Sequence, residues 1–378
     1  MRLLLAFDSF KGSLASLEVG EAFAAVWHAL SPSDDIRLLS IADGGEGTVD
    51  AVVESCGGEY RSIMAHDPLG RGITARYGVV DVDGRRSAVV ECASASGLTL
   101  IPAEERDAER ATSYGTGEVI ADAMAYGCRR IYVGLGGSAT TDGGMGMLRA
   151  LGYKFYDADG NELSGRGNDM INLSRIDASC RNRLLSDVEF IVATDVDNPL
   201  YGADGAAYIF APQKGADTAA VQRLDAGLRH YAEVVAEVVG GDLATSCGAG
   251  AAGGMGFALM TMVGAKRCRG IDMVLDIEQF DDYATQSDLI ITGEGSLDSQ
   301  TLRGKAPYGV LQRAMRHGVK AIAIGGRVED HDVLLAAGFD ALYTITPEGM
   351  PLREAMRSDV AKENVRRIAS HIHSQYKL

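Results

Sequence analysis

The amino-acid sequence predicts an α/β protein with mostly parallel sheets, and two features carry this prediction. Short apolar runs alternate with amphipathic segments of helical period, and glycine-rich turns follow most of the apolar runs. The first such unit is an apolar run at residues 3–7, a turn at 8–13 and a helical pattern at 16–30. An uninterrupted apolar run is typical of a strand buried on both faces, as in a parallel sheet. Repeated strand–turn–helix units then indicate parallel strands joined by right-handed crossovers.

The same unit recurs along the chain, with one interruption. Residues 74–82 and 86–92 are strand-like and flank Asp83-Gly84, a pair that favours a tight β-hairpin turn. The other expected strands are residues 36–41, 61–65, 130–135, 189–193, 288–291, 320–324 and 341–346. The expected helices are residues 49–56, 116–126, 145–151, 218–239, 308–317 and 352–376, with another that opens in the glycine-rich residues 248–256 and runs to 263.

The domain organisation follows from the two ends of the chain, which share the strand–turn–helix pattern. No change in composition marks a linker. We therefore expect a discontinuous Rossmann- or flavodoxin-like α/β domain of residues 1–65 and 286–378. A second α/β domain, residues 66–285, is inserted into it, which requires only that the termini of the insert lie close together.

Composition and charge limit the classes of partner. The chain has 378 residues, 46% of them hydrophobic, and a net charge of −16. Such a hydrophobic content excludes wholesale disorder. An acidic chain is a poor ligand for nucleic acid or for an anionic membrane surface, although a local basic pocket can still bind a small anion. The six cysteines are scattered without metal-ligand spacing, and no apolar stretch approaches membrane-spanning length, so we expect a cytoplasmic protein with reduced cysteines.

Glycines, short carboxylates, Ser, Thr and a few Lys gather after the expected strands, at the sheet edge where ligands bind. The turn Gly136–Thr140 follows a strand and precedes a helix, so its backbone N–H groups are suited to a phosphate. It matches neither the Walker sequence nor GxGxxG, and a tight packed turn is the alternative. Lys11 and Lys305 are candidates for phosphate or carboxylate contacts, against the alternative of solvated lysines.

Three aspartates carry the remaining chemistry. Asp195 and Asp197 alternate along an extended segment, so their side chains share a face. Asp43 flanks a Gly-Gly turn. Carboxylates in such positions can hold magnesium or accept a proton from a substrate hydroxyl. The alternatives are a helix cap, a turn cap or a solvated turn.

Eight collinear segments, which together span nearly the whole chain, closely resemble the bacterial type 1 glycerate kinase family. They are residues 8–13, 42–48, 67–70, 112–118, 136–142, 194–199, 212–215, and 292–298 with 304–307. Two positions depart from the family pattern: Phe7 stands where Pro is common, and Ser296 where Arg is common. The missing Arg weakens any anion contact assigned to that turn.

The resemblance implies ATP- and magnesium-dependent phosphorylation of D-glycerate in a cleft between two α/β domains. It implies transfer to the 2-hydroxyl, giving 2-phosphoglycerate and ADP. The 3-hydroxyl, with 3-phosphoglycerate as product, and a non-catalytic sugar-acid binding protein stay as alternatives. A nicotinamide-dependent dehydrogenase is disfavoured, because no first-strand GxGxxG occurs with an acid about 20 residues on. The oligomeric state, including a homodimer, is left open.

The expected roles are as follows. Asp195 orients or deprotonates the glycerate hydroxyl, and Lys11 contacts the transferred phosphate or the glycerate carboxylate. Asp197 or Asp43 holds magnesium. The expected nucleotide-binding residues are Gly136, Gly137, Ser138, Ala139, Thr140, Gly293, Glu294 and Gly295, and the expected substrate-binding residues are Ser9, Phe10, Asp43, Asp298 and Lys305.

Overall fold

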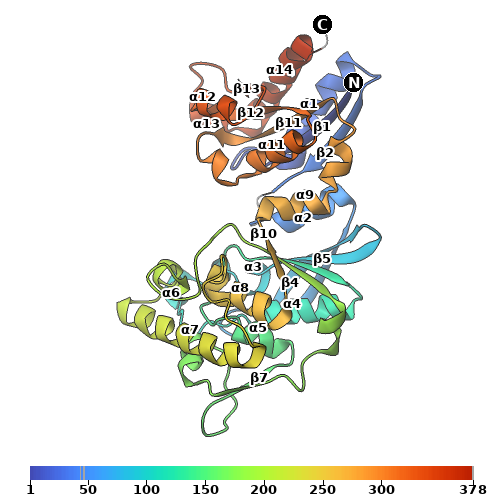
Figure 1. Ribbon diagram of the computed structural model, residues 1–378. Helices are drawn as coiled ribbons and strands as arrows, with labels where there is room; N and C mark the ends of the chain where they lie inside the picture. The colour runs from blue at the N-terminus through green and yellow to red at the C-terminus, as the bar shows by residue number, and fades with distance from the viewer. Residues whose placement is uncertain (43, 46, 377–378) are drawn as a thin grey trace. The chain divides into compact units, whose positions relative to one another are not determined.

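Two units make up the computed structural model, which describes residues 1–42, 44–45 and 47–376. Unit 1 comprises Met1–Asp43, Asp50–Gly57 and Ile271–Leu378, and unit 2 comprises Gly44–Val49 and Gly58–Gly270. Figure 1 shows the N-terminal segment in blue and the C-terminal segment in red, both within unit 1. The fold is α/β with mostly parallel sheets, as the sequence predicts.

Unit 1 is built on a five-stranded, fully parallel sheet in the order β13-β12-β11-β1-β2. Counted within the unit, this order is 2-1-3-4-5, and its direction of progression reverses between β1 and β11. The strands are β1 (Arg2–Phe7), β2 (Asp35–Ser40), β11 (Leu289–Leu297), β12 (Lys320–Val328) and β13 (Ala341–Thr344). The helices are α1 (Ser16–Leu30), α2 (Thr48–Cys56), α9 (Gly270–Ile277), α10 (Phe280–Ala284), α11 (Ala306–Arg316), α12 (His331–Ala336), α13 (Leu352–Ala355) and α14 (Ser358–Tyr376), with a 3₁₀ turn at Thr301–Arg303.

Helices from both ends of the chain cover one face of this sheet. Leu3, Leu5 and Phe7 of β1 form a buried cluster with Trp27 of α1 and Val365 of α14. Alternate residues of a strand share a face, so these three side chains point the same way. α11 packs against β11 and β12 but contributes nothing to this cluster, so it covers the opposite face. The uninterrupted apolar sequence of β1 thus reflects burial on both sides.

Unit 2 contains a six-stranded mixed sheet in the order β10-β9-β6-β5-β4-β3 and a small β7-β8 hairpin. β5, β6, β9 and β10 are parallel, while β3, β4 and β5 are joined antiparallel. The strands are β3 (Glu59–His66), β4 (Gly72–Val82), β5 (Arg85–Glu91), β6 (Arg130–Gly134), β7 (Lys154–Tyr156), β8 (Arg175–Asp177), β9 (Glu189–Ala193) and β10 (Lys266–Cys268). The α-helices are α3 (Ala93–Ser96), α4 (Tyr114–Ala125), α5 (Met145–Ala150), α6 (Ala206–Phe210), α7 (Thr218–Val239) and α8 (Met255–Ala258), followed by a π-helical turn at Leu259–Val263. The 3₁₀ turns are Leu98–Leu100, Ala103–Glu105, Gly167–Asn172, Arg183–Asp187, Pro212–Lys214 and Ala251–Gly254.

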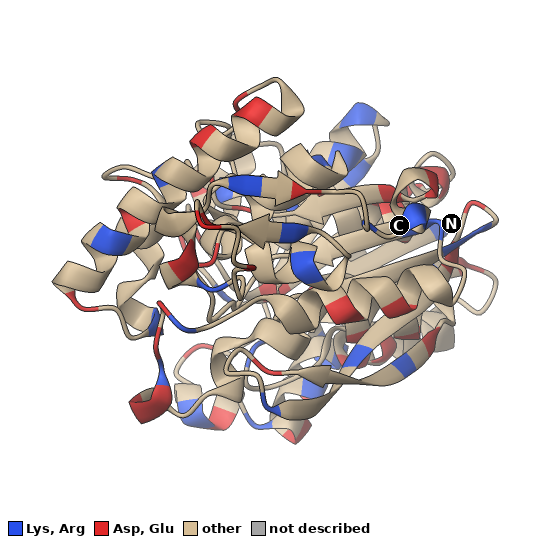
Figure 2. Ribbon diagram, turned by 90° about the horizontal axis from the view of Figure 1, so that it is seen from below, with Lys and Arg blue, Asp and Glu red and all other residues tan. Residues whose placement is uncertain are grey.

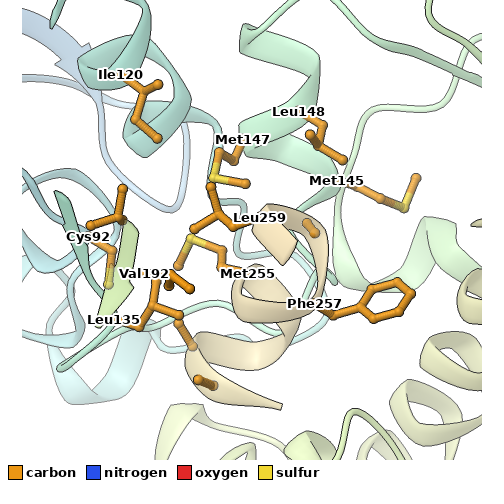
Figure 3. Close-up of a cluster of buried hydrophobic side chains, with 14 of the residues drawn as sticks. Cys92, Ile120, Leu135, Met145, Met147, Leu148, Val192, Met255, Phe257 and Leu259 are labelled. Carbon is orange, nitrogen blue, oxygen red and sulfur yellow. The ribbon is translucent and has the colours of Figure 1, made fainter. Parts of the chain in front are cut away.

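Methionine-rich packing forms the core of unit 2. Figure 3 shows Met147 of α5 near Met255 of α8 and Val192 of β9, and Met145 belongs to the same buried cluster. Asp83 and Gly84 both have positive φ angles, 55° and 73°, as a type I′ hairpin turn requires. The hairpin predicted from this pair is therefore present as β4–β5.

Two boundaries lie elsewhere than the sequence predicts. β3 belongs to unit 2, because Glu59–His66 pairs with β4 along its whole length. α9 and α10 belong to unit 1, because the Arg313 guanidinium on α11 donates hydrogen bonds to Asp276 of α9 and Asp281 of α10. Gly293–Gly295, expected to lie in a turn after its strand, instead continues β11, whose register with β12 runs on to Leu297. Within the described residues, no helix is long and apolar enough to cross a membrane.

Candidate active site

Unit 1 carries a pocket of about 900 Å³ at the carboxyl ends of β1, β11, β12 and β13. This edge of a parallel sheet, at the point where the strand order reverses, is where α/β proteins bind ligands. The pocket is lined by six of the residues singled out from the sequence: Ser9, Phe10, Lys11, Glu294, Gly295 and Lys305. The structure thus brings together, within one unit, two segments that lie almost 300 residues apart in the chain.

Charged groups of both signs face this pocket. Glu294 is buried, and burial raises the pKa of its carboxyl; a hydrogen bond from Thr301 Oγ1 at 2.8 Å and Lys305 Nζ at 3.5 Å oppose the rise. Asp8 is also buried and accepts a hydrogen bond from the Ser9 N–H at 2.6 Å. Lys11 is exposed and has no ion-pair partner among the residues that the structure describes. An anionic ligand would therefore displace no ion pair that Lys11 forms with a described residue.

Two further groups at the pocket are suited to an anion. Lys305 is the N-cap residue of α11, whose first turn contains Pro307. A helix N-terminus carries unpaired N–H groups and a partial positive charge. Ser13 Oγ lines the pocket and is buried without a hydrogen-bond partner in the described part of the chain. An unpaired buried hydroxyl costs free energy unless a ligand or a water satisfies it.

Gly293 and Asp298, which were expected to bind ligands, do not line the pocket and instead make contacts within unit 1. A Cβ on Gly293 would lie 2.2 Å from the Ile324 carbonyl oxygen, so this glycine permits β11 and β12 to approach closely. The Asp298 carboxylate accepts a hydrogen bond from the Gln300 N–H at 2.8 Å in the turn before α11. Asp298 lies near Glu294, and its negative charge contributes to raising the pKa of that carboxyl.

The remaining wall of the pocket was not expected from the sequence patterns. Residues 344–350, α13 and Met356 form this wall, which includes Ile345, Met350 and Leu352. These residues follow β13, the edge strand beside β12. Their position after a strand and the pair Glu348-Gly349, which also lines the pocket, were usable signals that the sequence reasoning did not take up.

In unit 2 the turn Gly136–Thr140 divides into an exposed and a buried part. Gly136 and Gly137 are exposed, and Gly137 has a φ angle of 73° that favours glycine. Ser138 and Thr140 are buried and bind Lys214: its Nζ donates to Thr140 O at 2.6 Å and to Ser138 Oγ at 3.0 Å. Only the two glycines therefore present their backbone to solvent.

Lys214 is a residue that reasoning from single motifs missed. It is buried, and burial lowers the pKa of its ammonium to about 8. It lies in the 3₁₀ turn Pro212–Lys214, which belongs to one of the eight family-like segments. Its contact with Ser138 joins residues 76 positions apart. The lysine fixes the buried half of the glycine turn.

The two aspartates after β9 are exposed and differ in their partners. Asp195 Oδ1 accepts a hydrogen bond from the N–H of Gly270, the first residue of α9, at 3.0 Å. Asp197 forms an ion pair with Arg267 at 2.6 Å. Asp43 lies outside the described residues. Among the residues that are described, no group of three or more His, Cys, Asp or Glu side chains could hold a metal ion.

Comparison with known proteins shows the family. Residues 3–377 match the model of the Glycerate kinase family. The chain belongs to this family. It is therefore an enzyme, a kinase that transfers a phosphoryl group to an alcohol, and the resemblance seen in eight segments is confirmed.

Relatives match over nearly the full length. The Glycerate kinase of Bacillus subtilis (strain 168) is 41% identical over 379 residues, covering 100% of this chain and 98% of the relative. The Glycerate 2-kinase of Escherichia coli (strain K12) is 41% identical, covering 98% of this chain and 97% of that protein. A crystal structure from Salmonella typhimurium LT2 that bears the name glycerate kinase 2 is 40% identical, with a TM-score of 0.89 over 100% of this chain and 98% of that chain.

Proposed function

We propose that the protein phosphorylates D-glycerate with ATP in a magnesium-dependent reaction. The product is 2-phosphoglycerate, released with ADP. The observation that carries the proposal is the match to the family model over residues 3–377. The choice of the 2-hydroxyl rests on the Escherichia coli relative, which is named Glycerate 2-kinase. Transfer to the 3-hydroxyl is the second candidate.

Lys11 is the proposed contact for the transferred phosphate or the glycerate carboxylate. Phosphoryl transfer is catalysed chiefly by positioning and by neutralising charge on the moving group. The exposed Lys11 ammonium at the unit 1 pocket can supply a positive charge there. Ser9, Phe10 and Lys305 line the same pocket and are proposed to complete the binding site.

Asp195 is the proposed group that orients or deprotonates the acceptor hydroxyl. An ionised carboxylate accepts several hydrogen bonds. The bond from the Gly270 N–H to Asp195 Oδ1 holds the carboxylate in a defined orientation. A positioned carboxylate of this kind contributes about 10²–10⁴-fold to a reaction that moves a proton.

Magnesium would neutralise charge on the nucleotide phosphates, and two sets of residues are candidates to hold it. Asp197 is the first, although its carboxylate is already paired with Arg267. Asp8 and Glu294 are the second: both are buried oxygen donors that line the unit 1 pocket. One or two carboxylates are sufficient, because magnesium in such sites keeps waters and binds phosphate oxygens. The pocket carboxylates fit this donor set better than the paired Asp197.

The proposal is tested by ADP release with D-glycerate, with and without magnesium. We expect ADP release only when D-glycerate and magnesium are both present. Phosphorus NMR of the product then distinguishes 2-phosphoglycerate from 3-phosphoglycerate. ADP release without an acceptor, or D-glycerate binding with no turnover, would contradict the proposed reaction; the latter is the result expected of a sugar-acid binding protein.

A further inference from the structure

The unit 1 pocket contains apolar side chains that a small hydroxy acid does not need. Phe10, Ile345 and Met350 line it together with Leu352 and Met356 of the α13 segment. Leu352 is 72% exposed and Met356 is 40% exposed. Large apolar side chains gathered in an exposed hollow are typical of a ligand site. Glycerate presents a carboxylate and hydroxyl groups, so it would leave this wall uncovered.

The size of the pocket also exceeds the needs of glycerate. Its lining crosses the carboxyl ends of four neighbouring strands, from β1 through β11 and β12 to β13. At about 4.8 Å per strand this is a span of roughly 14 Å. Its volume of about 900 Å³ lies at the upper end of pockets that bury drug-sized ligands. A three-carbon acid cannot fill such a space, whereas a nucleotide is long enough to cross it.

The polar and the apolar groups of the pocket come from different parts of the fold. Lys11 follows β1, as does Ser13, whose Oγ has no hydrogen-bond partner among the described residues, and Lys305 is the N-cap of α11. The apolar wall comes mainly from the segment after β13. A ligand that fills this pocket must carry negative charge near the middle of the sheet and an apolar group near its edge. A nucleotide has both, in its phosphates and its base.

We propose that this pocket is the nucleotide site, with the purine base against Met350, Leu352 and Met356 and the phosphates toward Lys11 and Lys305. The assignment rests on the proposed use of ATP. It places the nucleotide in unit 1, where β1 and β11 flank the reversal of strand order. The exposed Gly136 and Gly137 of unit 2 would then bind an anionic group other than the nucleotide phosphates.

The test separates base recognition from phosphate recognition in the full-length protein. Leu352→Asn and Met356→Asn are compared with Leu30→Asn and Met315→Asn. The control side chains are 50% and 57% exposed in the same unit and outside the pocket lining. Calorimetry measures the affinity for ADP and for inorganic tripolyphosphate. We expect each pocket variant to weaken ADP about tenfold, the effect of losing one apolar contact surface, with tripolyphosphate affinity unchanged. The control variants should bind both ligands like the wild type.

A second measurement needs no substitution. Photolabelling of the wild-type chain with 8-azido-ADP should mark the peptide that contains residues 344–361. A label confined to unit 2, or pocket variants that bind ADP like the wild type, would overturn the assignment. Failure of the proposed reaction would give a different result. If the wild-type protein binds ADP in this pocket but does not form ADP from ATP when D-glycerate is added, the proposed reaction is wrong and the nucleotide site is still supported.

Discussion

At the scale of single residues, Asp195 is a position where the charge can be removed while one backbone hydrogen bond is kept. Its Oδ1 accepts the Gly270 N–H, and an asparagine keeps an oxygen acceptor in that position. The substitution Asp195→Asn therefore removes the negative charge while it retains the hydrogen bond. If Asp195 only caps α9, this variant should keep its activity. If Asp195 takes part in proton transfer, the variant should lose activity.

We expect Asp195→Asn to lower kcat by about 10²–10⁴-fold while the protein still unfolds in one cooperative thermal transition. Steady-state kinetics and thermal unfolding measure the two effects. Asp242→Asn is the matched control, because exposed Asp242 Oδ1 accepts the Ala244 N–H at 2.8 Å in the same way. Near-normal turnover of Asp195→Asn would remove this residue from the mechanism.

Glu278 is a second residue whose environment has a measurable result. Its side chain is buried, and burial raises the pKa of the carboxyl to about 7, although Ser55 Oγ donates a hydrogen bond at 2.5 Å. Below pH 4.5 the group is protonated in both the folded and the unfolded state. Between pH 4.5 and 7 the folded state holds a proton that the unfolded state releases, so the free energy of unfolding falls as pH rises.

We expect the free energy of unfolding to fall between pH 4.5 and pH 8 by up to about 3 kcal/mol more in the wild type than in Glu278→Gln, as a shift of this size implies. Urea denaturation at several pH values measures the difference. Glu54→Gln is the control, because Glu54 is exposed and precedes Ser55 on α2; this variant should behave like the wild type. An equal pH dependence in wild type and Glu278→Gln would show that the carboxyl is solvated.

At the scale of elements, the pair β11–β12 determines the shape of the candidate site. Gly293 and Gly326 leave no room for a Cβ: the nearest atoms would be the Ile324 oxygen at 2.2 Å and the Gly295 oxygen at 2.6 Å. Glu294 and Gly295 line the pocket between these points of close contact. The backbone spacing of two strands therefore fixes the position of the buried carboxylate.

We expect Gly293→Ala to destabilise the protein by about 1–3 kcal/mol, the usual cost of overpacking, and to weaken nucleotide affinity through displacement of Glu294. Denaturant unfolding and calorimetry with ADP measure the two effects. Gly72→Ala in β4 is the control, because no described heavy atom lies within 4 Å of a Cβ placed there. Wild-type stability of Gly293→Ala would mean that the two strands can separate without cost.

Local sequence patterns predicted the elements better than the site. The amphipathic pattern at residues 218–239 gave α7 with its observed bounds, and Asp83-Gly84 gave the hairpin. Gly293-Glu294-Gly295 was expected to be a turn, because its continuation as a strand depends on pairing with β12. Lys214 was missed for the same reason: its role comes from contacts with Ser138 and Thr140, more than 70 positions away. Contacts that depend on folding leave no local signal.

At the scale of the whole molecule, charged residues are dispersed over the chain. The buried apolar residues form separate cores in the two units. Figure 2 shows Lys and Arg residues scattered among Asp and Glu residues, so the cations of the pocket are a local feature of an acidic chain. One core cluster contains only residues between Ala65 and Ala265, and a separate one forms in unit 1. Each unit thus buries a core of its own.

We expect residues 58–270, expressed alone, to fold into a stable domain, because this continuous segment contains the whole unit 2 core. A domain of this size with its own core can fold without the rest of the chain. Circular dichroism should show a cooperative thermal transition, and the fragment should not bind ADP. A fragment without a cooperative transition would mean that residues outside 58–270, either Gly44–Val49 or the unit 1 segments, are needed to stabilise unit 2.

The pairing of β1 with β11 has a consequence for how the chain is made. The Arg2 N–H donates to the Asp288 side chain across a separation of 286 residues. At about 5–20 residues per second, a ribosome needs roughly 15–60 s to supply that partner. During this interval the edge of β1 that pairs with β11 stays without its partner, and the inserted segment is completed before that partner is made. The sheet of unit 1 is therefore completed only after the inserted unit has been synthesised.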